Sequence, residues 1–308
     1  MRSGAKSEAV RASIGAIASM ASEIEFVAAD LNADAGWDQA AIGAQYVLHV
    51  ASPVPVTDPK HDDELVRPAR DGTLRVLKAA RDAGVKRVVM TSSISAIIFG
   101  HGVREQPFTE EDWTDETNHG DTSPYDRAKT IAERAAWAWL AAEGGGLELV
   151  TINPGLILGP VLGADFSASI EAIKKLLDGS IPVLPRFGFN VVDVRDVARL
   201  HALAMTTPAA AGQRFIVSGD FYWMSDVAKM LKQGLGDKAK KVPSIPVPDF
   251  VARVAALFDP IVRGRLYELG KKRPVSSEKA QRVLGWTPRP ITETVLDTAR
   301  SLQASGLV

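Results

Sequence analysis

The stretch KRVVMTSS, residues 86–93, is a short apolar run that ends in three hydroxyl-bearing residues. A helical pattern precedes it at Asp62–Ala83 and ends at Gly84, and a second long helical pattern follows at Pro124–Glu143. The next apolar run, Leu147–Ile152, lies directly beyond that helix. Continuous apolar strands that alternate with helices are typical of a parallel sheet covered on both faces. The sequence therefore predicts an α/β fold built on a doubly wound parallel sheet.

Upstream of this core, Glu23–Ala29 and Gln45–Val50 are predicted strands, with a short helical or turn segment at Trp37–Ile42 between them. The opening residues, MRSGAKSEAVRASIGAIASMA, superficially resemble an Arg- and Ser-rich transit peptide. An amphipathic surface helix is the better interpretation, because apolar residues recur on one helical face and a predicted strand follows at once. We therefore expect a cytoplasmic protein.

Downstream of Pro154, prolines and glycines make the pattern rich in turns. A strand end followed by a helix is predicted over Val191–Met205, and another strand over Gln213–Ser218. The remainder is predicted to be helical, interrupted by the proline-rich segment VPSIPVP at 242–248. This half predicts a smaller lobe that is interleaved with the last part of the sheet.

The composition excludes several classes of protein. With 308 residues, 46% hydrophobic and 24% charged, the chain is neither disordered nor fibrous. A net charge of −1 gives no electrostatic footprint for nucleic acid or anionic lipid, and no run of about 18 apolar residues could span a membrane. The absence of cysteine excludes disulfides and cysteine nucleophiles. The five histidines show no metal-binding spacing, so no metal site is expected.

Tyr125 and Lys129 stand four residues apart near the start of the second long helix, so they share one helical face. A nearby ammonium favours a phenolate, so Lys129 is expected to lower the pKa of Tyr125 and make it a usable acid/base. Ser92 and Ser93 end the preceding strand, at the sheet edge where ligands bind in doubly wound folds. The spacing alone is weak, because a tyrosine and a lysine on a helix surface are usually just solvated.

Together with their surroundings, these residues resemble the extended short-chain dehydrogenases/reductases. Within that group the chain is most similar to the dihydroflavonol-4-reductase-like and aldehyde-reductase-like members of the NAD-dependent epimerase/dehydratase superfamily. The motifs that carry the resemblance run through nearly the whole chain: AADLNAD (28–34), YVLHVASPV (46–54), RVVMTSSISA (87–96), TEEDWTD (109–115), TINPGLILGP (151–160), VVDVRDVARLHALAM (191–205), RFIVSG (214–219) and LGWTPRPITETVLDTARSL (284–302).

The resemblance implies a Rossmann-type dinucleotide-binding domain over residues 1–155 and a mainly substrate-binding lobe over 156–308, with 190–218 interleaved with the sheet. It also implies an NADP(H)-dependent oxidoreductase that transfers hydride between nicotinamide and a ketone, an aldehyde or a secondary alcohol. Tyr125 would be the acid/base, Lys129 would hold the nicotinamide ribose, and Ser93 would be the catalytic serine, with Ser92 left open.

Further cofactor contacts follow from the same resemblance. They are Asp30 and Leu31 at the adenine ring, Val50, Ala51 and Ser52 in the loop beside the cofactor, Pro154, Gly155, Leu156 and Ile157 flanking the nicotinamide, and Ser169 as a weaker match. Asp30 could instead cap the segment that follows it, and Pro154 and Gly155 could be plain turn residues.

A G-x-x-G-x-x-G turn, which binds the pyrophosphate in such enzymes, occurs nowhere among the 25 glycines. The register of the motifs places Met1 at the end of the family's second strand. We therefore expect Glu23–Ala29 to lack a ladder partner and an apolar edge to be exposed beside Gln45–Val50. A misassigned start codon or a fragment would explain this register, and a genuinely shortened protein that has lost dinucleotide binding is the alternative.

Arg2 and Lys6 match the basic residues that grip the adenosine 2′-phosphate in NADPH-using relatives, so NADP(H) is expected over NAD(H). Both could equally be solvated surface charges. The expected partner is a small carbonyl or alcohol substrate, with no nucleic acid and no membrane, and the protein is expected to be a monomer or homodimer. Two other functions stay open: a nucleotide-sugar epimerase or dehydratase, and a non-catalytic binding protein.

Overall fold

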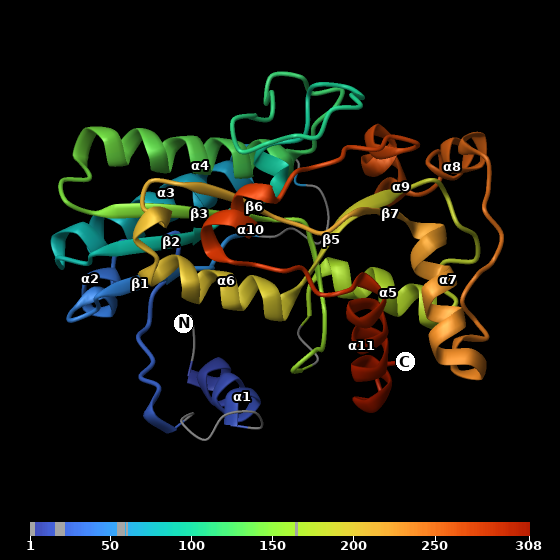
Figure 1. The fold of residues 1–308 in the computed structure, drawn as a ribbon, viewed down its shortest axis with the longest axis horizontal. Helices are drawn as coiled ribbons and strands as arrows, with labels where there is room; N and C mark the ends of the chain where they lie inside the picture. The colour runs from blue at the N-terminus through green and yellow to red at the C-terminus, as the bar shows by residue number, and fades with distance from the viewer. Residues whose placement is uncertain (1–3, 16–21, 54–58, 60, 164–165) are drawn as a thin grey trace.

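The computed structural model describes residues 4–15, 22–53, 59, 61–163 and 166–308 (Figure 1). Its main sheet is parallel and has the strand order β1-β2-β3-β6. These strands are β1 (Tyr46–His49), β2 (Arg87–Thr91), β3 (Glu148–Pro154) and β6 (Arg214–Val217). A second sheet has the order β4-β5-β7, with β4 (Leu156–Leu158) parallel to β5 (Gly188–Asp193) and β7 (Phe221–Trp223) antiparallel to β5.

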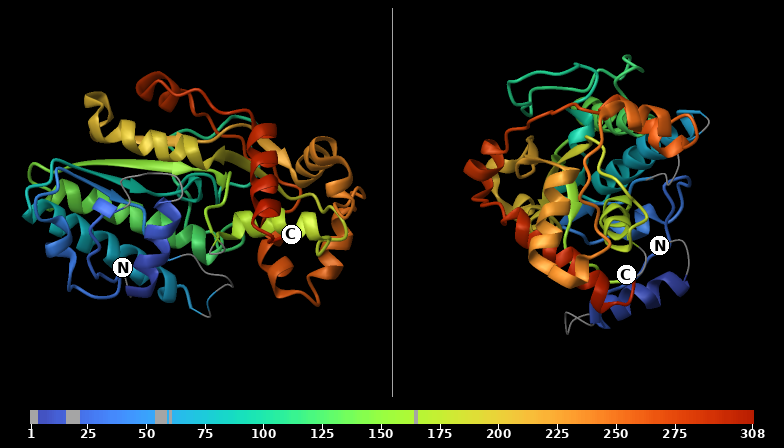
Figure 2. Two further views of the ribbon diagram at one scale, coloured as in Figure 1. Left: turned by 90° about the horizontal axis from the view of Figure 1, so that it is seen from below. Right: turned by 90° about the vertical axis from the view of Figure 1, so that its right-hand side faces the viewer.

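Both faces of the main sheet are covered, as the uninterrupted apolar strands predict (Figure 2). Val88 and Met90 pack toward α3 (Asp63–Asp82) and α4 (Pro124–Glu143), in a cluster that includes Leu77 and Ala136. Val89, between them in sequence, packs with Leu200 of α6 (Val194–Thr206) and Leu284 of α10 (Glu278–Leu284). Successive side chains of a strand point to opposite faces, so this alternation fixes the two helical layers. The doubly wound α/β fold is confirmed.

A second core lies around the β4-β5-β7 sheet. Leu158, Leu176, Leu231 and Leu302 are buried together there. The helices around them are α5 (Ala168–Asp178), α7 (Met224–Leu235) and α11 (Ile291–Ala304), and α8 (Asp249–Ala255) and α9 (Pro260–Arg265) lie further out (Figure 1). This part of the chain is mainly helical after residue 218, as predicted, while β6 returns to the main sheet.

The predicted elements agree closely with the described ones. The long helix predicted at Pro124–Glu143 is α4, and Gly84, with φ +73°, ends the helix before β2. The short helical segment is α2 (Trp37–Ala41), and the opening residues form α1 (Gly4–Gly15). The predicted strand at Glu23–Ala29 is wrong: it belongs to no sheet of the described chain, and instead Arg11 donates to the carbonyl oxygen of Ile24.

The reason is that no described strand lies beside Glu23–Ala29, since a strand exists only through its ladder. In the described part of the chain β1 is an edge strand; Leu48 within it is 43% exposed, and Val50 just after it is 60% exposed. The predicted exposed apolar edge is therefore confirmed.

The parallel strands bring their carboxyl ends to one edge of the sheet. His49 pairs with Met90, and Thr91 pairs with Ile152, so the residues after β1 and β2 and the end of β3 lie side by side. Helix α4 begins next to this edge, where Ser123 and Asp126 form a capping box. The fold therefore places the start of α4 against Ser92 and Ser93.

No helix formed by the described residues is long and apolar enough to cross a membrane.

Candidate active site

Ser93 lies at a sharp corner just beyond β2. The backbone N–H of Ser92 still donates to Ile152 of β3 at 2.8 Å, which continues the ladder by one residue. Ser93 then caps the short 3₁₀ helix η2 (Ile94–Ala96), with its Oγ accepting from the Ser95 N–H at 3.0 Å. The Oγ is an acceptor in this bond, so its proton is free to be donated elsewhere.

Tyr125 and Lys129 share one face of the first two turns of α4, as their spacing predicts. The Ser93 side chain is close enough to the Tyr125 hydroxyl to lower the pKa of the phenol, which brings the helix next to the end of β2. The Lys129 ammonium lies over the Tyr125 ring, 5.8 Å from its centroid. The structure thus brings together the three residues expected to carry catalysis.

The pKa of Tyr125 runs opposite to the expectation. Burial raises the pKa to about 12, the carboxylate of Asp126 adds to the rise, and the Ser93 hydrogen bond and the Arg265 charge oppose it. Lys129 lies over the ring rather than beside the hydroxyl, so it does not lower the pKa here. The phenol is therefore protonated throughout the neutral range.

The Lys129 side chain is almost completely buried. It is 6% exposed, and burial lowers its pKa to about 8 against the opposing charge of Glu133. Its ammonium makes no hydrogen bond to any residue that the structure describes. A buried charge without hydrogen-bond partners is unfavourable, so this donor fits a ligand hydroxyl such as that of a nicotinamide ribose. The residues present fit the nicotinamide end of a dinucleotide, whereas no glycine-rich turn occurs in the sequence to receive a pyrophosphate.

The two candidate serines differ in their surroundings. The Ser92 hydroxyl donates to the buried carboxylate of Glu133 at 2.5 Å, and it lies on the helix side of the strand end. Ser93 is the serine that reaches Tyr125. These surroundings favour Ser93 over Ser92 for the predicted serine role, which stays a prediction.

The segment predicted to flank the nicotinamide connects the two sheets. Pro154 ends β3, and Leu156 and Ile157 belong to β4. Ser169, near the start of α5, donates to the carbonyl oxygen of Ile157 at 2.8 Å, so it is brought to the same segment. Gly155 stands between β3 and β4, and its backbone N–H donates to the carbonyl oxygen of Val217 in β6.

Gly155 is required by close packing rather than by the turn alone. A Cβ on it would lie 2.4 Å from the backbone oxygen of Asn190. We expect Gly155→Ala to lower the free energy of unfolding by about 1–3 kcal/mol, because the β3–β4 segment and β5 must move apart. Gly146→Ala is the control, since its Cβ would meet nothing within 4 Å. Urea unfolding of both variants measures the difference, and equal stabilities would contradict the packing argument.

The predicted adenine contacts lie in a turn before α2. Asp30 Oδ1 accepts from the Asn32 backbone N–H at 2.9 Å, so its carboxylate stabilises this turn, as the alternative interpretation held. The carbonyl oxygen of Leu31 accepts from Arg75 of α3. Val50, Ala51 and Ser52 follow β1 at the same sheet edge as Ser93. Arg2 lies outside the described residues, and Lys6 lies in α1, where its side chain is not described.

Sequence reasoning missed a web of polar side chains behind this site. Glu133 is fully buried and pairs with Arg214 of β6 at 2.7 Å. Asn153 and Thr151 of β3 also contact its carboxylate. The signal that could have found it is the spacing, because Glu133 stands four residues after Lys129 on the same helical face.

A second set of contacts that sequence reasoning missed joins the chain after α9 to α4. Tyr267 Oη donates to Asp126 Oδ2 at 2.9 Å, directly beside Tyr125. Lys271 and Arg273 both contact Asp121, each at 2.5 Å. The start of α4 is therefore held by a residue 141 positions away in sequence.

His49 is a core histidine, as expected from its place in a strand. It is 6% exposed and its Nε2 lies 3.3 Å from Thr73 Oγ1. Burial first, and then the positive charge of Lys129, lowers its pKa from 6.5 to about 4.

This pKa predicts a loss of stability in acid. Above pH 6.5 His49 is neutral in both states; as the pH falls from 6.5 to about 4, only the unfolded state takes up the proton. We expect the free energy of unfolding to drop by about 3 kcal/mol across this window through His49. Urea unfolding of wild type and His49→Gln at both ends of the window checks this, and an equal drop in both proteins would contradict it.

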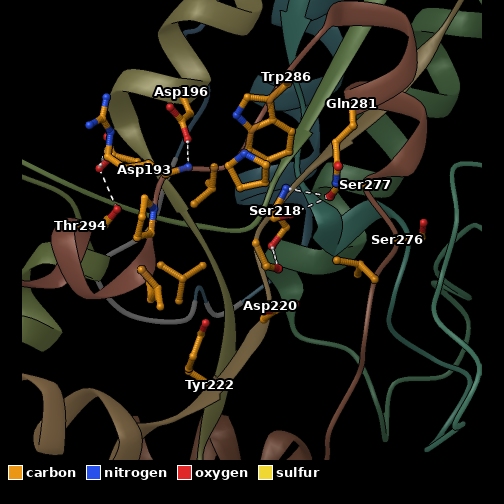
Figure 3. Close-up of a pocket in the computed structure, with 18 of the residues that line it drawn as sticks. Asp193, Asp196, Ser218, Asp220, Tyr222, Ser276, Ser277, Gln281, Trp286 and Thr294 are labelled. Atoms are coloured by element: carbon orange, nitrogen blue, oxygen red, sulfur yellow. Dashed lines mark hydrogen bonds and ion pairs between the residues drawn. The ribbon is translucent and has the colours of Figure 1, made fainter.

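Figure 3 shows a cavity of about 410 Å³ on another part of the molecule, between β5, β7 and the starts of α6 and α11. In it Thr294 donates to Asp193 at 2.8 Å and Ser277 donates to the Ser218 carbonyl oxygen at 2.7 Å. The described lining residues include none of the three predicted catalytic residues. A second cavity, of about 520 Å³, is lined by α1 and by the segment that begins at Ile157. Among the described residues no cluster of three or more His, Asp or Glu side chains could hold a metal ion.

Comparison with known proteins places this geometry in a family. The 3-beta hydroxysteroid dehydrogenase/isomerase family matches residues 11–231. Tetraketide alpha-pyrone reductase 1 from Arabidopsis thaliana is 32% identical over 81% of this chain and 74% of its own length. A cinnamoyl-CoA reductase from Medicago truncatula is 31% identical over 91% of this chain and 80% of its own length.

The fold agrees with these sequence relationships. The crystal structure of a yeast methylglyoxal/isovaleraldehyde reductase complexed with NADPH superposes with a TM-score of 0.80 and 25% identity. The superposition covers 100% of this chain and 91% of the yeast protein. The chain belongs to the 3-beta hydroxysteroid dehydrogenase/isomerase family, and within it to the NAD(P)-dependent reductases of the extended short-chain dehydrogenase/reductase type.

Proposed function

We propose that this protein reduces the carbonyl group of a small aldehyde or ketone to an alcohol, with NADP(H) as the hydride carrier. The observation that carries the proposal is the convergence of Ser93, Tyr125 and the unpartnered Lys129 ammonium at one sheet edge. The yeast reductase complexed with NADPH and the expected phosphate contacts of Arg2 and Lys6 support NADP(H) over NAD(H).

In this function Tyr125 is the proton donor. Its pKa of about 12 keeps the phenol protonated at neutral pH, which suits reduction better than oxidation. As the carbonyl carbon gains hydride and its oxygen becomes negative, the Tyr125 proton passes to that oxygen and completes the alcohol. The bound dihydronicotinamide supplies the hydride.

Ser93 and Lys129 have separate tasks during the reduction. The Ser93 hydroxyl is within reach of the Tyr125 oxygen and of a carbonyl oxygen beside it, so it stabilises the developing oxyanion. The Lys129 ammonium, which lies over the Tyr125 ring and makes no hydrogen bond to a described residue, would donate to a ribose hydroxyl. Water then returns a proton to Tyr125.

An activity assay with a panel of carbonyl compounds tests this function. The full chain is mixed with NADPH or NADH and with methylglyoxal, isovaleraldehyde, an aromatic aldehyde or an aliphatic ketone, and cofactor oxidation is followed by absorbance. We expect carbonyl-dependent oxidation, with a higher kcat/KM for NADPH than for NADH. Failure of every carbonyl with both cofactors would overturn the proposal.

A further inference from the structure

A fully buried carboxylate lies one helical turn beyond Lys129. Glu133 is 0% exposed, and Tyr125, Lys129 and Glu133 follow one another at intervals of four along the same face of α4. A carboxylate is tolerated in such a place only where donors surround it. The donors around Glu133 show which parts of the site its carboxylate holds in place.

The two oxygens of Glu133 face different partners. Oε1 forms the ion pair with Arg214 Nε at 2.7 Å and lies 3.4 Å from Trp137 Nε1. Oε2 accepts from Ser92 Oγ at 2.5 Å and from Asn153 Nδ2 at 2.7 Å. The Thr151 hydroxyl lies 3.0 Å from both Glu133 Oε1 and Asn153 Oδ1 and can donate to one of them at a time.

The Oε2 side leads directly to the catalytic serine. Asn153 Nδ2 donates both to Glu133 and to the backbone oxygen of Ser93, the latter at 3.1 Å. Ser92, the residue before Ser93, is held by its side chain to the same carboxylate oxygen. Both residues of the corner that aims Ser93 Oγ at Tyr125 are therefore attached to Glu133.

The charge of Glu133 also acts on Lys129. The groups that face this region are Tyr125 and Asp126 of the same helix, His49 at the end of β1, Arg214 of β6 and Arg265 at the end of α9, while β2 and β3 contribute only neutral side chains. Among them, Glu133 is the group whose charge raises the pKa of Lys129 against the effect of burial. Without it, the ammonium would lose its proton at a lower pH.

We propose that Glu133 is a positioning residue for carbonyl reduction: through Ser92 and Asn153 it fixes the corner that carries Ser93, and it places a buried negative charge one helical turn from Lys129. The role rests on the proposed function, but its two physical consequences can be measured separately. One is the ionisation of Lys129, and the other is the rate of the proton-coupled reduction.

Glu133→Gln removes the charge and keeps the size of the side chain. Glu148→Gln is the matched control, because Glu148 pairs with the buried Arg87 at 2.6 Å across the amino ends of the same two strands, far from the site. Both substitutions take a carboxylate from a buried arginine, so both lower the Tm. Only Glu133→Gln is expected to change Lys129 and turnover.

The Lys129 readout needs no cofactor. Lysines of the full chain are reductively methylated with isotope-labelled formaldehyde and titrated by NMR, with Lys129→Met identifying the signal. We expect a midpoint near 8 in the wild type and in Glu148→Gln, and a midpoint about one unit lower in Glu133→Gln. An unmoved midpoint in Glu133→Gln overturns the electrostatic half of the role.

The turnover readout compares pH profiles of kcat. In Glu133→Gln we expect kcat to fall at least about tenfold and the decline at high pH to begin at a lower pH, with little change in KM for NADPH. Asn153→Ala keeps the Glu133–Arg214 pair and tests the corner alone, even if Glu133→Gln does not fold. It is expected to lower kcat at least about threefold without moving the Lys129 midpoint.

Two results of the kinetic comparison would count against the proposal, and a third outcome concerns the proposed function. Glu133→Gln or Asn153→Ala with wild-type kcat would overturn positioning of the Ser93 corner. A loss of kcat in Glu133→Gln matched by Glu148→Gln would reduce Glu133 to a stability role. If the wild type reduces no carbonyl, the proposed function fails, and the Lys129 titration still decides whether Glu133 controls that ammonium.

Discussion

Tyr125→Phe is expected to lower kcat for carbonyl reduction by roughly 100- to 10,000-fold, the range for loss of a general acid. The structure places the phenol beside the Ser93 side chain, and its pKa of about 12 keeps it protonated at neutral pH. The substitution removes one hydroxyl and leaves the ring on which Lys129 lies. KM for NADPH should therefore change little.

Steady-state kinetics on the full chain measures this effect. Tyr46→Phe is the matched control, because Tyr46 begins β1 at the opposite end of the sheet from the site. We expect Tyr46→Phe to turn over like the wild type. A Tyr125→Phe variant with undiminished kcat would falsify the assignment of Tyr125 as the proton donor.

We expect Lys129→Met to raise the stability of the protein near neutral pH and to lower its activity. The ammonium is nearly buried and has no hydrogen-bond partner among the described residues, and burial lowers its pKa from 10.5 to about 8. Below pH 8 the folded state therefore carries a desolvation penalty that the unfolded state does not. Replacing the charge with an apolar side chain of similar length should raise the free energy of unfolding by up to about 3 kcal/mol near neutral pH.

The stability difference between the wild type and Lys129→Met should depend on pH. Because the pKa of Lys129 is lower in the folded state, the wild type gains stability as the pH rises from 8 to 10.5, and Lys129→Met does not. The two proteins should therefore converge in stability at high pH. Urea unfolding at several pH values checks this, and a variant less stable than wild type at neutral pH would contradict it.

The same substitution should impair reduction. Without the ammonium, the ribose hydroxyl loses its donor, so the nicotinamide is held less firmly beside Tyr125. We expect kcat to fall about 100-fold or more and the Kd for NADPH to rise. A stabilised variant with wild-type kcat and Kd would remove Lys129 from the site.

The elements around the site were predictable from local pattern. The apolar runs at β1, β2 and β3 and the uninterrupted pattern of α4 are properties of neighbouring residues, so they appear in the sequence directly. The same holds for Tyr125 and Lys129, whose spacing of four puts them on one helical face. The strand predicted at Glu23–Ala29 failed because apolar β-forming residues make a strand only beside a partner.

The electrostatics of the site depended on residues that are distant in sequence. The pKa of Tyr125 is raised first by burial, and it is lowered in part by the charge of Arg265, which comes from far along the chain. The partner of Glu133 is Arg214, 81 residues further along the chain. Gly155 likewise reads as a turn residue until β5 is placed against it. These contacts are created by the fold, and no local pattern contains them.

The transfer of an isotope label tests the central claim most directly. The full chain is given a carbonyl substrate and NADPH that carries deuterium at the reactive position of its dihydronicotinamide, and the alcohol is analysed by mass spectrometry and NMR. We predict that deuterium appears on the former carbonyl carbon, and that Tyr125→Phe forms this labelled alcohol at least about 100-fold more slowly. Consumption of NADPH without labelled alcohol, or equally fast labelling by Tyr125→Phe, would contradict carbonyl reduction at this site.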